Sequence, residues 1–371
     1  MDTNKLQTFE FKGTPEVRGH QHGETLRPRI AELLQRWGEG IQRTHGLTPE
    51  IYAQRFFAQT RFRQSLEHYA PNVLAEVMAI ASAANVSPDQ LLAFQHVNEE
   101  FWYDPKQGAE ACSTIALGKC ATQPTLVAQN LDLDSYLDGY QILIRYNCDQ
   151  SDGRILVLSV PGMISLNGMN SFGFAICDNT LVQLRTDPAG VPIFALYRLA
   201  LECRTVAQAR RLFSELPHAS GLNWVMGDPT EVAMLESSAG SIVPHTSNDP
   251  SKPIFHTNHP LRSTNLTPDR LQSWAQTSRA RPSRSSYLRL ATLQERLSGL
   301  RGTLSMDQIK TILSSKDDPD YPVSRGGGLS GDDIPIGFTL ACCIFELDAA
   351  RPQLHIASGP PDHTEFRTFL A

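Results

Sequence analysis

Cys112 lies where the character of the chain changes. It stands in the run Ala-Glu-Ala-Cys-Ser-Thr-Ile-Ala-Leu, between a polar N-terminal third with helical spacing and a longer region rich in strand-forming residues. The thiolate of a cysteine is a nucleophile that attacks a carbonyl carbon and holds the acyl group as a thioester. A nucleophile at such a boundary suggests a precursor that cleaves itself.

A cysteine at a new N-terminus would carry its own base. The ordinary pKa of an α-amine is about 7.7–8.0 and that of a thiol is about 8.5, so a proton passes between them at little cost. In the intact chain this amine is locked in the peptide bond between Ala111 and Cys112. Thiol attack on the Ala111 carbonyl, followed by hydrolysis of the resulting ester, would free the amine and switch the enzyme on.

Two other functions stay open at this point. The chain could remain whole, with residues 1–111 covering the site, and act as a binding or regulatory protein. It could also be a cysteine hydrolase that uses a histidine base and needs no cleavage, with His256 or His259 as the first candidates. A denaturing gel separates these functions, because a cleaved protein gives two fragments and a whole chain gives one band near 41.1 kDa.

The elements that must position Cys112 follow from the spacing of apolar residues. Before it, apolar residues recur three and four apart from about residue 25 to 98, and Thr48-Pro49 and Ser87-Pro88 are typical helix starts, which predicts three or four helices. After it, short apolar runs between turn residues predict strands over 113–117, 125–134, 140–147, 154–160 and 172–178. Helices are predicted over 193–202, 206–216, 285–297 and 306–314, and strands over 338–347 and 353–357. Strands in the middle flanked by helix pairs suit a four-layer αββα sandwich.

The predicted strand over 125–134 has a polar face. Side chains alternate along a strand, which places Asn130, Asp132 and Asp134 on the same side. Spacing alone does not decide which of the two carboxylates lies nearest to Cys112.

Several separated segments occur in order along about residues 15–295. They are Gly19-His-Gln-His-Gly23, Cys112-Ser-Thr114, Gln129-Asn-Leu-Asp132, Asn167-Gly-Met-Asn170, the stretch from Asn223 to Glu236, His256-Thr-Asn-His259 and Ser286-Tyr-Leu-Arg289. This ordered set resembles the acyl-coenzyme A:6-aminopenicillanic acid acyltransferase (isopenicillin N acyltransferase) family of cysteine N-terminal-nucleophile hydrolases, which cut themselves before a cysteine. Two positions depart from the family. Ala111 stands where a glycine often precedes the scissile bond, and Leu131 replaces the usual aromatic residue, which suggests a different acyl pocket.

The resemblance implies an α+β fold, the four-layer αββα sandwich of N-terminal-nucleophile hydrolases. Residues 1–111 would form a helical propeptide or small subunit whose first helix follows Gly19–Gly23, and residues 112–371 the αββα catalytic domain or large subunit. The expected activity is that of an amidohydrolase or acyltransferase that acts on a small-molecule amide or acyl thioester through an S-acyl-enzyme. Hydrolysis is the simpler outcome, because transfer requires a second pocket for the acceptor. We expect the cleaved fragments to stay associated, because separation would expose their apolar helix faces.

The resemblance also implies roles for particular residues. Cys112 would be the nucleophile, and cleavage would fall between Ala111 and Cys112. Asn258 is predicted to donate to the oxyanion, because a neutral amide stabilises developing negative charge without titrating. Asp132 would hold the α-ammonium or orient the thiol. The residues predicted to bind or position the substrate are Thr114, Asn130 and Asp134.

Composition excludes several classes of partner. The net charge of −6 and the pI near 6.0 argue against nucleic acid binding, and we interpret the arginines between Arg262 and Arg289 as a solvated helix face. No apolar run is long enough for a secretory signal or a membrane helix, and an odd number of cysteines, seven, fits reduced thiols, so we expect a cytoplasmic protein. His256-x-x-His259 lacks the further ligands of a metal cage, so we predict neither a metal nor a cofactor.

Overall fold

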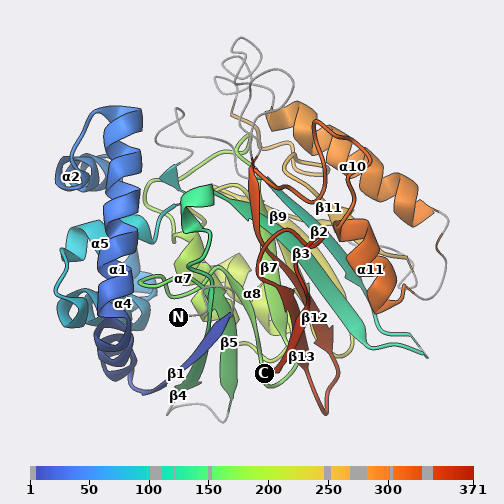
Figure 1. The fold of residues 1–371 in the computed structure, drawn as a ribbon, viewed down its shortest axis with the longest axis horizontal. Helices are drawn as coiled ribbons and strands as arrows, with labels where there is room; N and C mark the ends of the chain where they lie inside the picture. The colour runs from blue at the N-terminus through green and yellow to red at the C-terminus, as the bar shows by residue number, and fades with distance from the viewer. Residues whose placement is uncertain are drawn as a thin grey trace.

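A computed structural model of the chain describes residues 6–97, 99–100, 111–120, 122–148, 153–245, 252–267, 282–298, 300, 304–327 and 337–371. Two β-sheets pack face to face, and helices cover both outer faces (Figure 1). The predicted α+β fold with a four-layer αββα sandwich is confirmed.

The larger sheet has eight strands in the order β1-β4-β5-β6-β7-β8-β9-β10. Their bounds are β1 Gln7–Gly13, β4 Ile142–Cys148, β5 Arg154–Ser159, β6 Asn167–Asn170, β7 Ala175–Thr180, β8 Leu222–Gly227, β9 Val232–Ser238 and β10 Ser241–His245. Neighbouring strands pair antiparallel except β1 and β4, which are parallel.

The smaller sheet has six strands in the order β11-β2-β3-β12-β13-β14. Their bounds are β2 Ala111–Leu117, β3 Thr125–Leu133, β11 Ile254–His256, β12 Phe338–Leu347, β13 Gln353–Ala357 and β14 Arg367–Leu370. Strand β2, which carries Cys112, lies between β11 and β3, and β3 pairs with it along its whole length. The strand that bears the predicted nucleophile is therefore held from both sides.

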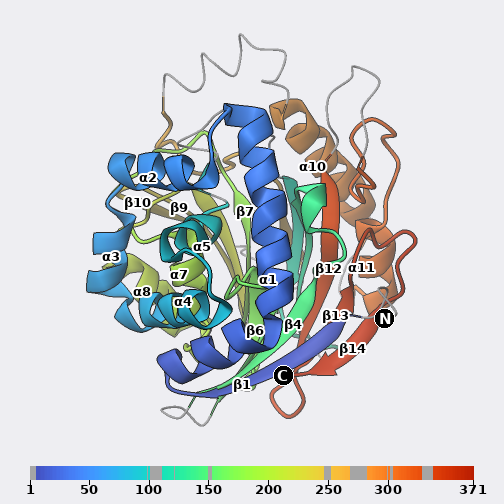
Figure 2. The ribbon, with the colours of Figure 1, turned by 60° about the vertical axis from the view of Figure 1, so that its left-hand side comes forward.

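Different sets of helices cover the two sheets. The larger sheet is covered by α1 Pro15–His45, α2 Pro49–Gln59, α3 Phe62–Tyr69, α4 Pro71–Ala84, α5 Pro88–Phe94, α7 Ile193–Ala200 and α8 Val206–Glu215 (Figure 2). The smaller sheet is covered by α10 Pro282–Ser298 and α11 Met306–Leu313, and a short 3-10 helix, Ser135–Leu137, follows β3. One apolar core fills the space between the sheets and under the N-terminal helices, and a second lies between the smaller sheet and α10 and α11.

Helices α1 and α4 cross at two glycines. A Cβ atom on Gly19 would lie 2.3 Å from the carbonyl oxygen of Glu76, and one on Gly23 would lie 2.4 Å from that of Ile80. The expectation that the first helix follows these glycines is wrong, because α1 already begins at Pro15 and contains both. Glycine is a poor helix former, but here the close approach of two helix backbones leaves no room for a side chain.

The region before Cys112 is built into the sandwich. It supplies β1, the edge strand of the larger sheet, which pairs in parallel with β4. Glu76 of α4 accepts hydrogen bonds from Arg18 of α1 and from Arg198 of α7, and all three side chains are buried. Residues 6–111 thus contain a strand as well as helices. Among the described residues, no helix is long and apolar enough to cross a membrane.

The last strand, β14, contacts the residue before the first strand, β1. Nη1 of Arg367 in β14, close to the C-terminus, donates a hydrogen bond of 3.1 Å to the backbone carbonyl of Leu6, which directly precedes β1. The first and last described segments of the chain are therefore in contact.

Candidate functional site

Cys112 is the second residue of β2, and 2% of its surface is exposed. It lies opposite Leu131 in the register of β2 and β3, and both belong to the core cluster between the sheets. Alternation along β2 puts Thr114 on the same face and Ser113 on the other. Thr114 donates a hydrogen bond of 2.7 Å from its hydroxyl to Oδ1 of Asn179 in the larger sheet. The thiol therefore faces the interior of the sandwich, beside a polar bridge between the sheets.

Asn258 meets Cys112 because β11 runs antiparallel to β2. His256 lies opposite Thr114, so two residues later the chain reaches the level of Cys112. Oδ1 of Asn258 accepts a hydrogen bond of 2.7 Å from the backbone N–H of Cys112, and Nδ2 donates one of 3.1 Å to the carbonyl of Thr180. The structure thus brings the predicted nucleophile and the predicted oxyanion donor together, with the side-chain oxygen of Asn258, not its nitrogen, facing Cys112.

Arg289 is a site residue that the sequence analysis missed. It lies in α10, 1% exposed, and its Nη1 donates to the carbonyl of Cys112 at 2.7 Å and to Oγ of Ser113 at 2.9 Å. Its Nη2 donates to Oδ1 of Asn258 at 2.9 Å. Burial lowers the pKa of Arg289 to about 10, which leaves it a cation at neutral pH. The solvated helix face that we predicted suits the exposed Arg284 and is wrong for Arg289.

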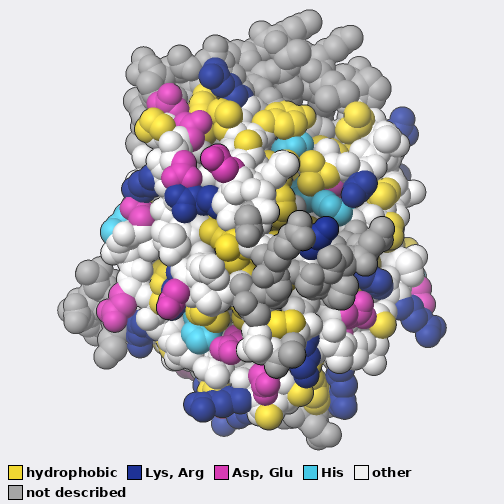
Figure 3. Space-filling view, turned by 90° about the vertical axis from the view of Figure 1, so that its right-hand side faces the viewer, with side chains coloured by type: hydrophobic (Ala, Val, Ile, Leu, Met, Phe, Trp, Pro, Cys, Tyr) yellow, Lys and Arg dark blue, Asp and Glu magenta, His cyan; other side chains and the backbone are white. Residues whose placement is uncertain are grey.

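The face of the molecule over α10 and α11 carries mixed charge. Lys and Arg side chains are interspersed with Asp and Glu over its described part (Figure 3). Arg262 and Arg284 are exposed, whereas the predicted basic residues Arg279 and Arg281 lie outside the described residues. The arginine of this stretch that contacts Cys112 is therefore the buried one, Arg289.

Asp132 lies beside the predicted scissile bond but on the opposite face of the sheet from the thiol. In the β2–β3 register it pairs with Ala111, and its Oδ1 accepts a hydrogen bond of 2.6 Å from the hydroxyl of Thr339. Nε of Arg325 lies 3.9 Å from Oδ2. Burial raises the pKa of Asp132 to about 6 against the opposing effect of Arg325 and Arg289. The carboxyl is thus placed to balance two buried cations around the site.

The two other polar residues of this stretch have different surroundings. Asn130 lies on the face of β3 turned away from the thiol of Cys112, and its Nδ2 donates to the carbonyls of Leu313 at 2.8 Å and Val323 at 2.9 Å. Asp134 follows the end of β3 and is exposed. Neither shares the face that carries the thiol, and their roles in substrate positioning stay predictions.

Ser286 supports the backbone of Asn258. Its Oγ accepts the N–H of Asn258 at 2.7 Å, lies 2.7 Å from Nδ1 of His259, and donates to Oγ1 of Thr257 at 2.9 Å. The hydroxyl proton is therefore used toward Thr257, and Nδ1 of His259 donates to Ser286. Burial lowers the pKa of His259 to about 4, so the ring is neutral at physiological pH. His259 belongs to the scaffold of the Asn258 turn.

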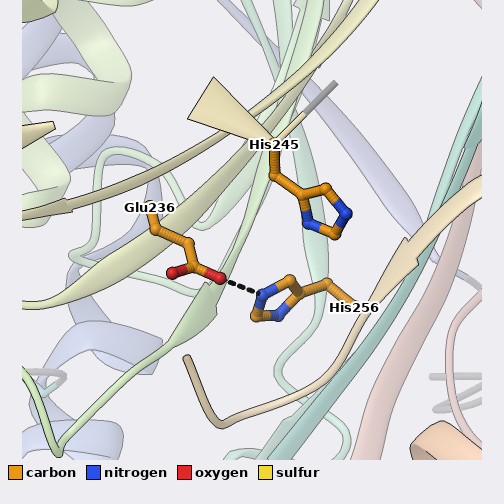
Figure 4. A group of neighbouring side chains, drawn as sticks. All are labelled: Glu236, His245 and His256. Atoms are coloured by element: carbon orange, nitrogen blue, oxygen red, sulfur yellow. Dashed lines mark hydrogen bonds and ion pairs between the residues drawn. The ribbon is translucent and has the colours of Figure 1, made fainter. Parts of the chain in front are cut away.

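The side chain of His256 on β11 reaches Glu236 on β9 of the larger sheet. Its Nε2 lies 3.0 Å from Oε1 of Glu236, and His245 lies beside the pair (Figure 4). The ligand atoms of these three residues lie within 4.8 Å of one another, a grouping that could hold a metal ion. The sequence signal was absent, because Glu236, His245 and His256 stand on three different strands at spacings that no known metal motif has.

The chain matches a known protein family over most of its length. The family model described as acyl-coenzyme A:6-aminopenicillanic acid acyl-transferase matches residues 120–358. The chain belongs to this family. The resemblance seen in the ordered segments is thereby confirmed, as is the assignment to an enzyme family of acyl transfer.

One known acyltransferase matches almost the whole chain. Over 363 residues the chain is 25% identical to the 40 kDa form of the acyl-coenzyme A:6-aminopenicillanic-acid-acyltransferase of Emericella nidulans, with 96% of this chain and 95% of the relative covered. Three solved structures each match 70% of this chain at low identity. They are the Caenorhabditis elegans ortholog of N-acylethanolamine-hydrolyzing acid amidase (12% identity, 100% of that chain, TM-score 0.43), a mutant conjugated bile acid hydrolase from Clostridium perfringens (13%, 96%, 0.40) and penicillin V acylase from Agrobacterium tumefaciens (14%, 85%, 0.41).

Proposed function

We propose that the protein is a self-processing N-terminal-cysteine enzyme that hydrolyses or transfers the acyl group of a small-molecule amide or acyl thioester through an S-acyl-enzyme on Cys112. Family membership supports the acyl-transfer chemistry. The observation that carries the proposal is how the backbone of Cys112 is held, with its N–H on Asn258 and its carbonyl on Arg289. A cut before Cys112 would release an α-amine that already lies 2.7 Å from Oδ1 of Asn258.

Self-processing requires no other reactant than water. The sulfur of Cys112 attacks the carbonyl carbon of Ala111, the C–N bond breaks, and the thiol proton passes to the leaving amine. Water then hydrolyses the thioester, which leaves a carboxylate on Ala111 and restores the thiol. Ala111 is small, so the attack is not blocked sterically, and its register partner Asp132 lies beside the bond that breaks.

Turnover of substrate would use the same atoms. The free α-amine takes the thiol proton, the thiolate attacks the acyl carbon, and the leaving amine or thiol takes the proton. Water or an acceptor amine then cleaves the thioester. Arg289 and Arg325 each interact electrostatically with Cys112, and nearby cations favour the thiolate. Asn258 as the donor to the oxyanion is part of this proposal and requires the substrate oxygen to replace the carbonyl of Thr180 at Nδ2.

The geometry favours the amine over a histidine as the base, because the amine belongs to the same residue as the thiol. Both ring nitrogens of His256 face oxygen atoms of Thr257 and Glu236, and Nδ1 of His259 donates to Ser286, which leaves Nε2 of His259 as the competing base. An uncleaved binding protein of the same fold is the remaining alternative. It would leave the site without a base, since the nitrogen of Cys112 would stay an amide.

We also propose that the fragments stay together after cleavage. The N-terminal fragment would keep β1 in the larger sheet and Glu76 on Arg198 of the other fragment. Oε1 of Glu99, also before the cut, accepts the N–H of Ile193 at 2.6 Å. These contacts support a cleaved protein that remains one folded body.

Intact mass spectrometry of freshly purified protein tests the proposal. Wild-type protein is expected to give two fragments that meet between Ala111 and Cys112, and the Cys112→Ala variant one whole chain. Cys120→Ala, which changes a more accessible cysteine eight residues away, should cleave like the wild type. A wild-type chain that stays whole, or a Cys112→Ala chain that is cut, would refute self-processing.

A further inference from the structure

Glu236 is a buried acid that the proposed chemistry does not use. It lies on β9 of the larger sheet, 0% exposed, and its carboxylate reaches His256 on β11 of the smaller sheet at 3.0 Å (Figure 4). A buried charge is costly unless it is paired and fully hydrogen-bonded. The contact also joins the larger sheet to β11, the strand that pairs with β2.

The same carboxylate binds the backbone on the far side of Asn258. Oε1 accepts the N–H of Leu261 at 2.6 Å, and Oε2 accepts those of Arg262 at 3.0 Å and Ser263 at 2.5 Å. Glu236 therefore holds both ends of the turn over residues 257–260, the side chain of His256 before it and the backbone amides after it. Asn258 lies within this turn.

Oxygen atoms lie at both ring nitrogens of His256. Nδ1 lies 2.6 Å from the carbonyl of Thr257, and Nε2 lies 3.0 Å from Oε1 of Glu236. The ring is therefore held in place from both sides. Burial raises the pKa of Glu236, but the hydrogen bonds from His256, Ser263 and Leu261 outweigh it and bring the pKa to about 2.

A metal ion would conflict with these hydrogen bonds. His245 completes a His-His-Glu group of a kind that zinc uses, and its buried Nδ1 has no hydrogen-bond partner among the described residues. Coordination through Nε2 of His256 would, however, remove the N–H that now binds Glu236, whose two oxygens already accept bonds from His256 and from three backbone amides. The contacts fit a hydrogen-bonded pair better than a metal site.

We propose that Glu236 and His256 form a positioning pair for the acyl-transfer reaction, which fixes the turn over 257–260 so that Asn258 meets Cys112. Neither residue touches the reacting atoms. They act through Asn258, and the inference rests on the proposed function because it assigns Asn258 a role in the chemistry at Cys112.

The variant Glu236→Gln tests the pair through the rate of self-cleavage, which needs no known substrate. Glutamine replaces one acceptor oxygen with an NH₂ group that faces backbone N–H donors or His256. We expect slower appearance of the two fragments, by up to about 10²–10³-fold, the loss expected from removing an oxyanion donor such as Asn258 itself. Glu236→Asp, which keeps the charge, should recover part of the rate.

A double variant separates positioning from general loss of structure. If Glu236 acts through Asn258, Glu236→Gln combined with Asn258→Ala should cleave no more slowly than Asn258→Ala alone. Glu346→Gln is the matched control, because it breaks a second Glu–His pair, with His355 at 3.0 Å, on β12 and β13 away from the turn. It should cleave at the wild-type rate.

The outcomes are distinct. A folded Glu236→Gln variant that cleaves at the wild-type rate, or a double variant whose losses multiply, would overturn the positioning pair. Loss of cleavage in wild-type protein on chelation and its return with Zn²⁺ would overturn it in favour of a metal site. If Glu236→Gln does not fold, His256→Gln, which removes the imidazole ring that lies between Glu236 and Thr257, takes its place with the same expectations. A wild-type chain that never cleaves would refute the proposed function instead.

Discussion

Replacing Glu76 by glutamine measures what holds the N-terminal region to the rest of the sandwich. Oε2 of Glu76 accepts a hydrogen bond of 2.7 Å from Arg18, and Oε1 accepts one of 3.0 Å from Arg198. The exposed fractions of the arginine side chains are 7% and 3%, and Arg198 lies 4.0 Å over the ring of Tyr146. In Glu76→Gln, two buried guanidinium groups would lose the carboxylate that they share, and the new NH₂ group would face one of them.

The magnitude follows from burial. Removing one partner of a buried ion pair typically costs about 3–5 kcal/mol, because the remaining charge is left uncompensated. Asp89→Asn is the matched control, since it breaks the pair with Arg63 at the surface, where the side chains are 34% and 58% exposed. An exposed pair is worth about 0–1 kcal/mol.

The assay is urea denaturation in the Cys112→Ala background, so that cleavage does not complicate unfolding. We expect Glu76→Gln to lower the free energy of unfolding by about 3–5 kcal/mol and Asp89→Asn by less than about 1 kcal/mol. Equal and small losses in both variants would refute the reasoning, because they would show that the buried acid contributes no more than a solvated one.

Three further predictions use the same denaturation and cleavage assays. Gly19→Ala should destabilise the protein by about 1–3 kcal/mol, because its Cβ would lie 2.3 Å from a backbone oxygen of α4. Gly40→Ala in the same helix, whose Cβ would have nothing within 4 Å, should instead stabilise the protein by about 0.5–1 kcal/mol. Melting temperatures of the two variants that move in the same direction would contradict this prediction. Burial lowers the pKa of His22 to about 4, and its Nε2 accepts the N–H of Gly162 at 3.0 Å, so the stability from its neutral ring should be present above about pH 6.5 and lost, by about 3 kcal/mol, as the pH falls through about 4. His22→Gln should flatten this dependence, and an unchanged pH profile would disprove the assignment. Arg289→Lys keeps the charge but loses the guanidinium group that contacts Cys112, Ser113 and Asn258 together. Self-cleavage, followed by mass spectrometry over time, should therefore slow by about 10- to 100-fold. A wild-type rate of cleavage would mean that the positive charge alone suffices.

The fold could be predicted where local pattern and tertiary structure agree. Strands β12 and β13 begin and end where their apolar alternation does, at 338–347 and 353–357. β1 was not predicted, because its partner β4 lies more than 130 residues away and a single edge strand carries a weak local signal. The start of α1 was misplaced because the propensity of glycine opposes its packing role at the crossing with α4.

The candidate site, too, could be predicted only in part. Cys112 and Asn258 were found from residue type and order along the chain, and the register of β11 on β2 brings them into contact. Arg289 was missed because an arginine in a basic stretch gives no sign of burial until helix and sheet pack. Glu236 gave no signal either, since its partners lie on another sheet and in the backbone of residues 261–263.

The contact between Arg367 and the carbonyl of Leu6 makes circular permutation practical. Because the first and last described segments touch, a short linker from the segment after Arg367 to Leu6 would not stretch the fold, and new ends could be opened between Ala111 and Cys112. Such a chain would be synthesised with Cys112 directly after the initiator methionine. Removal of that methionine would expose the α-amine without any cut by the protein itself, so that catalysis on substrates could be studied apart from maturation.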